Sequence, residues 1–187
     1  LLAIQLLWIN LVTDSFPAIA LGLEREEKNI MNRKPRDSKE SIFAGGLWQK
    51  IITEGVMLGC LTLFSFSLGT RLFGITVGRT MAFVSLGMLE LVHSFNVKSE
   101  ESIFKLGFFE NKYLIGSLLL GTLLQVIVVV VPYFANIFEL APLNAIQWIY
   151  TGLISIVPLI VGELQKKIRG FGSSKKIYLN SRNSMNY

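Results

Sequence analysis

The stretch Gln5-Leu-Leu-Trp-Ile-Asn-Leu-Val-Thr-Asp-Ser-Phe-Pro-Ala-Ile-Ala-Leu-Gly22 decides how the rest of the chain is interpreted. Apolar residues dominate it, as in a membrane-spanning helix, yet Asn10, Thr13 and Asp14 lie in its middle. A carboxylate near the centre of a bilayer costs about 2.5–3.5 kcal/mol on insertion scales. Such a residue faces protein or a water-filled path, and by default it marks an ion or proton site.

The spacing of these polar residues favours an oxygen cluster. In an α-helix Asn10, Thr13 and Asp14 stand at i, i+3 and i+4, so they share one face. Hard cations prefer oxygen ligands. Pro17 has no N–H, so the carbonyl of Thr13 loses its helical partner beside that face. The pattern predicts a cation site, and the alternative is a hydrogen-bonded buried Asp14 with Pro17 as a simple kink.

The whole composition indicates a membrane protein. Of the 187 residues 51% are hydrophobic, and they occur in long runs that ordinary soluble domains do not sustain. We expect an all-α, polytopic membrane helix bundle at residues 1–170, followed by a basic, mobile tail at 171–187. The five expected transmembrane helices are at about 1–23, 47–73, 79–97, 112–133 and 145–166.

The distribution of basic residues predicts the orientation in the membrane. Sixteen of the 18 Lys and Arg fall in the first and third connections, at the helix ends beside them, or in the C-terminal region. Only Arg71 and Arg79 fall on the opposite side. Basic residues accumulate on the cytoplasmic side of membrane proteins. We therefore expect the N-terminus outside and the C-terminus in the cytoplasm.

Two other expected helices carry polar residues of note. Glu90 is a second carboxylate well inside an apolar segment, and its own helix offers no Lys or Arg partner. It must pair with another helix, take a proton or bind a cation. The fourth helix has no charge in its interior and only Gln125 as a strong polar group, so we expect a scaffold or lipid-facing helix.

Residues 7–22 closely resemble the sixth transmembrane helix of P-type cation-transporting ATPases, most of all the sarco/endoplasmic reticulum-type calcium pump. In that family the Asn, Thr and Asp of this motif are cation ligands, which implies the same role for Asn10, Thr13 and Asp14. Sodium/potassium pumps usually carry Asp where this chain has Asn10. Plasma-membrane calcium pumps typically carry Met where it has Thr13.

The resemblance extends along nearly the whole chain apart from its tail. Residues 86–96 resemble the eighth helix of the endoplasmic-reticulum type, in which a Glu matching Glu90 is a ligand. Residues 28–37 are similar to the loop between the sixth and seventh helices, which lies under the phosphorylation domain. Residues 141–148 and 155–163 resemble the last outside loop and the tenth helix. The resemblance thus implies the last five of ten helices.

The resemblance also implies what this chain does not supply. Calcium takes 6–8 oxygen ligands, more than Asn10, Thr13, Asp14 and Glu90 offer, and in the family the others come from earlier helices. The sequence has no Asp-Lys-Thr-Gly phosphorylation motif, so ATP and Mg²⁺ would act only through domains outside this chain. We expect a C-terminal part of a longer protein that does not hydrolyse ATP by itself.

The expected partners are the lipid bilayer and the upstream half of the same pump, with no nucleic acid. The expected location is an integral membrane protein, in the plasma membrane if the source is bacterial. Two alternatives stay open. One is a pump for another cation, Mn²⁺ or Na⁺/K⁺, because oxygen ligands alone do not separate these ions. The other is a non-transporting membrane scaffold or remnant.

Overall fold

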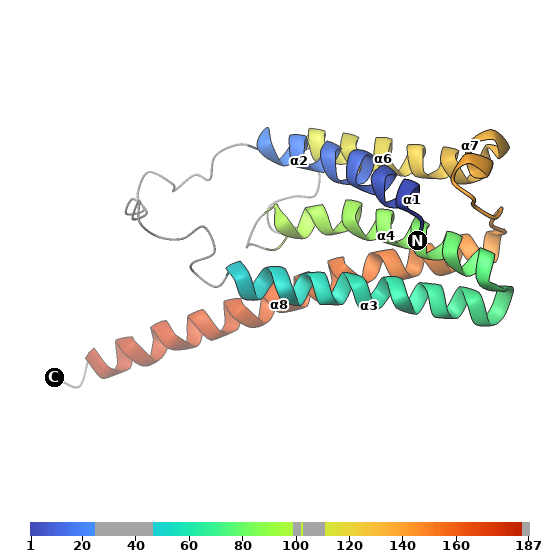
Figure 1. Ribbon diagram of the computed structural model, residues 1–187. Helices are drawn as coiled ribbons and strands as arrows, with labels where there is room; N and C mark the ends of the chain where they lie inside the picture. Colours follow the sequence, from blue (N-terminus) through green and yellow to red (C-terminus); the bar gives the residue numbers. More distant parts are fainter. Residues whose placement is uncertain (25–46, 99–101, 103–110, 185–187) are drawn as a thin grey trace.

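The computed structural model describes residues 1–24, 47–98, 102 and 111–184, with side chains as far as residue 168 (Figure 1). The loop predicted at 28–37 lies outside the described residues. Five helices are long and apolar enough to cross a membrane: Ala3–Gly22, Leu47–Phe73, Ile75–Val97, Lys112–Val130 and Ala145–Ile168. The described part of the chain has no strand. The predicted all-α bundle of five membrane-length helices is therefore confirmed.

The first of these helices changes its winding twice. It begins as α1 (Ala3–Trp8), continues as the π-helix η1 (Ile9–Asp14), and ends as α2 (Ser15–Gly22). A π-helix closes i→i+5 hydrogen bonds, and such turns are rare and frequent at functional sites. The irregular winding coincides with the polar residues that the sequence analysis singled out.

The next two helices form a close antiparallel pair. α3 (Leu47–Phe73) and α4 (Ile75–Val97) are joined at Gly74, whose φ of 94° is a conformation that side chains with a Cβ rarely adopt. Because this single residue makes the turn, α4 begins at Ile75 rather than at the expected residue 79. Near the turn, Gly69 and Gly78 bring the two backbones into direct contact.

The last elements are shaped by two prolines. α6 (Lys112–Val130) ends just before Pro132, which begins the short helix α7 (Pro132–Ile137), so the apolar helix stops short of the expected residue 133. α8 (Ala145–Ser184) carries Pro158 in its interior. The sequence predicted a helix to about residue 166 and a mobile tail, whereas the backbone of α8 stays helical to Ser184 and extends beyond the other helices (Figure 1).

α4 is the central helix of the bundle. It lies between the pair formed by α3 and α8 on one side and the pair formed by η1 and α6 on the other (Figure 1). Most of its side chains are buried, and Phe83 lies at the centre of the main apolar cluster. The outward faces of the other helices expose large apolar side chains such as Leu11, Val56 and Leu119. Glu90, on α4, is thereby placed against the first helix.

The glycine contact between α3 and α4 gives a test of this packing. A Cβ on Gly78 would lie 2.7 Å from the backbone nitrogen of Thr70 and 2.9 Å from the carbonyl oxygen of Phe66. Because both neighbours are backbone atoms, Gly78→Ala should force the helices apart and destabilise the protein by about 1–3 kcal/mol. Gly59→Ala is the control, because Gly59 lies on the exposed surface of α3 and a Cβ there would have no atom within 4 Å. Equal unfolding midpoints of the two variants in detergent would contradict the contact.

Candidate cation-binding site

The π-helix separates the three polar residues of the first span. Thr13 is only 1% exposed, whereas Asn10 and Asp14 are exposed at the surface of the described bundle. A π-helix has more residues per turn than an α-helix, so position i+3 turns away from positions i and i+4. The predicted single face is therefore wrong: Thr13 points into the bundle, and Asn10 and Asp14 do not follow it.

Thr13 makes the contact that joins the two predicted ligand helices. Its Oγ1 lies 2.9 Å from Glu90 Oε2 and 2.7 Å from the carbonyl oxygen of Ile9. A hydroxyl has one proton to donate, so it serves one of these oxygens at a time. The other oxygen must be satisfied by another donor or by a cation. The structure thus brings Thr13 and Glu90 together, although 77 positions separate them in the sequence.

Asp14 adds a second carboxylate to this region. It is exposed, and it lies close enough to half-buried Glu90 for their charges to interact. Two neighbouring carboxylates that are both ionised repel each other, and a cation between them removes that repulsion. Among the described residues no ion pair joins Asp14 or Glu90 to a lysine or arginine. The arrangement is therefore suited to bind a cation.

The described donors do not complete a coordination shell. Residues 1–24, 47–98, 102 and 111–168 contain no cluster of three or more His, Cys, Asp or Glu side chains able to hold a metal. Thr13 and Glu90 offer a hydroxyl and a carboxylate, with the Asp14 carboxylate beside them. The side chain of Asn10 lies on the exposed side of η1.

Gly87, on α4, leaves room for two side chains next to the site. A Cβ on Gly87 would lie 3.2 Å from Thr13 Cγ2 and 3.2 Å from the amide of Gln125, tighter than most such contacts. Gln125 itself is fully buried, and it bonds to both the first helix and α4. The sequence alone did not predict these contacts, because α6 is apolar on every side. A lone amide in an uncharged membrane helix was the available signal.

A second polar cluster holds the far end of the first span. Asn111, which caps α6, donates from Nδ2 to the carbonyl oxygen of Ala20, 3.1 Å away, and to the carboxylate of Glu24. Lys98 pairs with the other oxygen of Glu24 at 3.3 Å. The end of α2 is thus tied to α6 and to the residue that follows α4.

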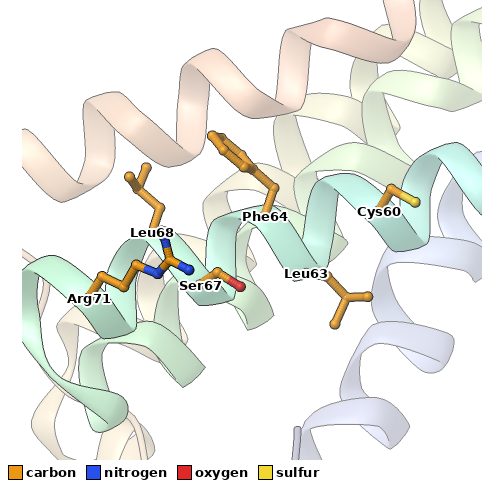
Figure 2. Close-up of a pocket in the computed structure, with 6 residues that line it drawn as sticks. All are labelled: Cys60, Leu63, Phe64, Ser67, Leu68 and Arg71. Carbon is orange, nitrogen blue, oxygen red and sulfur yellow. The ribbon is translucent and has the colours of Figure 1, made fainter.

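The surface of α3 carries a separate, open pocket. Its lining residues all belong to α3: Cys60, Leu63, Phe64, Ser67, Leu68 and Arg71 (Figure 2). None of Asn10, Thr13, Asp14 and Glu90 lines it. The pocket is mostly apolar and shallow, so it is unsuited to hold a small cation.

Membrane-length helices with an interrupted span beside buried oxygen donors define a membrane transport domain. The chain matches the family model described as "Cation transporting ATPase, C-terminus" over residues 1–168. It belongs to this family of cation-transporting ATPase C-terminal domains.

Individual relatives agree with the family match. The chain is 41% identical to calcium-transporting ATPase 1 of Bacillus cereus over 181 residues, which is 87% of this chain and 20% of that protein. It is 36% identical to the calcium-transporting ATPase of Bacillus subtilis, over 88% of this chain and 19% of that protein. An endoplasmic reticulum calcium ATPase of Aspergillus fumigatus is 26% identical over 89% of this chain and 20% of its own length. The chain thus spans about a fifth of the length of these relatives.

Proposed function

We propose that this chain is the C-terminal membrane part of an ATP-driven Ca²⁺ pump and supplies part of its intramembrane ion site. The observation that carries the proposal is the hydrogen bond between Thr13 and Glu90, beside a π-helix and a second carboxylate. It joins residues of two different spans that the resemblance names as ligands. The relatives above are all named as calcium or calcium-transporting ATPases.

The four ligands have distinct places in this proposal. Thr13 and Glu90 bind the ion on the side of η1 that faces α4, and Asp14 reaches it from the exposed side. Asn10 and Asp14 leave their outer side open to further oxygen ligands from the upstream half of the pump. Asp14, between Asn10 and Glu90, is the best placed to bridge two ions. Calcium's need for 6–8 oxygens makes that second set of ligands necessary.

ATP and Mg²⁺ act through the upstream half of the pump, in domains that this chain does not contain. Phosphorylation there switches the helices between two exposures of the ion site, and the ligands bind Ca²⁺ in one state and release it in the other. Differential binding of this kind requires the ligand helices to shift relative to each other. The irregular winding of η1 is a point in the first span at which such a shift needs few broken bonds.

The bilayer is the expected surrounding of this bundle. The exposed apolar side chains on α1–α2, α3, α6 and α8 support lipid contact, and the basic residues support a cytoplasmic C-terminus and an outside N-terminus. The bacterial relatives favour the plasma membrane. Mn²⁺ or Na⁺/K⁺ transport is the competing function, since oxygen donors alone do not select among these ions.

Asp14 gives the most direct test of the ion site. In the complete pump Asp14→Asn should abolish Ca²⁺-dependent phosphorylation by ATP, because it removes a charge from an already partial shell. ATP binding should persist, since it belongs to another domain. Glu139→Gln, which neutralises an exposed carboxylate outside the five spans, is the control. Unchanged Ca²⁺ uptake into inverted vesicles by Asp14→Asn would refute the proposed site.

Glu90 tests whether α4 contributes a ligand. Glu90→Ala should remove one class of bound Ca²⁺ in equilibrium binding and leave the other measurable, because the second site would use Asn10 and upstream oxygens. Glu90→Gln keeps a carbonyl oxygen and should have the smaller effect. If wild type binds one ion and Glu90→Ala leaves its affinity unchanged, Glu90 is structural and the pump is of a one-site type.

The orientation can be tested by cysteine labelling in a variant without other reactive cysteines, Cys60 included. A cysteine at Ser174 should react only with a reagent supplied from the cytoplasm, and one at Asn136 only from outside. Sixteen of 18 basic residues on one side give the physical reason. Labelling of both positions from the same side would rule out the five-span topology.

A further inference from the structure

Gln125 is a fully buried amide in a helix that supplies none of the proposed ligands. It is 0% exposed, and it lies in α6 among leucines and valines. Its Oε1 accepts from the indole Nε1–H of Trp8 at 3.2 Å, and its Nε2 donates to the carbonyl oxygen of Phe83 at 3.3 Å. The side chain thus connects α6 to the first span and to α4 at the same point.

The bond to Trp8 fixes the place where the winding of the first span changes. Trp8 is the residue directly before η1. Its ring also packs edge-to-face against Phe138, with centroids 5.3 Å apart. Held by these two contacts, Trp8 defines where the π-helix begins. Thr13 follows five positions later, so the direction of its hydroxyl depends on this anchor.

The hydrogen bond from Gln125 to Phe83 fixes the position of Gln125, and with it Trp8, relative to Glu90. Phe83, Gly87 and Glu90 stand at i, i+4 and i+7 on α4, which places them along one face. Over Gly87 the amide of Gln125 and the methyl of Thr13 both lie where a Cβ would come within 3.2 Å of them. Gln125 therefore lies beside Thr13 on the α4 face that carries Glu90. It adjoins the proposed ligands and is not one of them.

The stability of the helix bundle gives only a weak reason for an amide side chain at position 125. Hydrogen bonds between membrane helices contribute little net stability, because the unfolded helices also find partners. A fully connected buried polar group does, however, select one relative placement of the helices that it joins. An apolar residue at position 125 would fill the space without selecting any placement.

We propose that Gln125 is a positioning residue for the cation site, holding the start of η1 against α4 so that Thr13 and Glu90 meet. The inference rests on the proposed function, and it assigns a role in ion affinity to α6, which binds no ion itself. Residues that orient metal ligands from outside the coordination shell typically change affinity 10–100-fold when they are mutated.

The test measures Ca²⁺-dependent ATPase activity of the complete pump. Gln125→Leu leaves the indole N–H of Trp8 unpaired, so it should raise the Ca²⁺ concentration for half-maximal activity about 10–100-fold. The rate at saturating Ca²⁺ should change by less than about twofold, because the ligands remain present. Ser117→Ala is the matched control, since this buried hydroxyl of α6 bonds, among the residues that the structure describes, only to the Leu114 carbonyl of its own helix. Its half-maximal concentration should equal that of wild type.

A second variant keeps the test decisive if Gln125→Leu does not fold. Trp8→Phe removes the indole N–H and keeps an aromatic ring against Phe138, so it should raise the half-maximal concentration in the same direction. In the double variant the two effects should be less than multiplicative, because both remove one bond. Unchanged Ca²⁺ dependence in either single variant overturns the inference. Asp14→Asn separates failure of this inference from failure of the proposed function. If Gln125→Leu has no effect but Asp14→Asn still abolishes Ca²⁺-dependent phosphorylation, the proposed function stands without the role of Gln125. If Asp14→Asn also has no effect, the proposed cation site itself is wrong.

Discussion

The hydrogen bond between Thr13 and Glu90 is the contact around which the polar interior of this bundle is arranged. A carboxylate inside a membrane-spanning bundle is costly unless a partner faces it. α4 presents Glu90 toward the first span because α3 and α8 cover its other side. The first span can meet it only if Thr13 points inward at that level, and the π-helix provides that orientation. The winding of the first span, the order of the helices and the pairing of Thr13 with Glu90 therefore depend on one another.

Two polar connections from α6 lie on either side of this contact. Gln125 holds the beginning of η1, and Asn111 holds the end of α2 through the Ala20 carbonyl and Glu24. Between these points, within the described residues, the polar contact of the first span with another helix is the one from Thr13 to Glu90. A helix fixed at both ends and irregular in its middle can change its winding locally. This is the mechanical behaviour that a site alternating between two exposures requires.

The sequence was sufficient for the helix count, because long apolar runs have few other interpretations. Polar groups stand out against an apolar background, so Asn10, Thr13, Asp14 and Glu90 could be named as candidate ligands, and that role stays a prediction. It could not predict the π-helix: Pro17 signalled an irregularity, but the α-helical template of i, i+3 and i+4 assumed the winding that the structure lacks. The pairing of Thr13 with Glu90 depends on helix packing, which no local pattern encodes.

The same limitation explains Gln125 and the exposed donors. An all-apolar helix such as α6 has no amphipathic face, so the sequence could not show that its single amide points inward. The π-helix divides the oxygen donors into two groups, with Thr13 facing α4 and Asn10 and Asp14 facing the surface that the described helices leave uncovered. A single α-helical face would have directed all three toward one neighbour. Because η1 directs them to two sides, the proposed function assigns one span two roles: it contributes ligands beside α4, and it meets further ligands from the upstream half of the proposed pump.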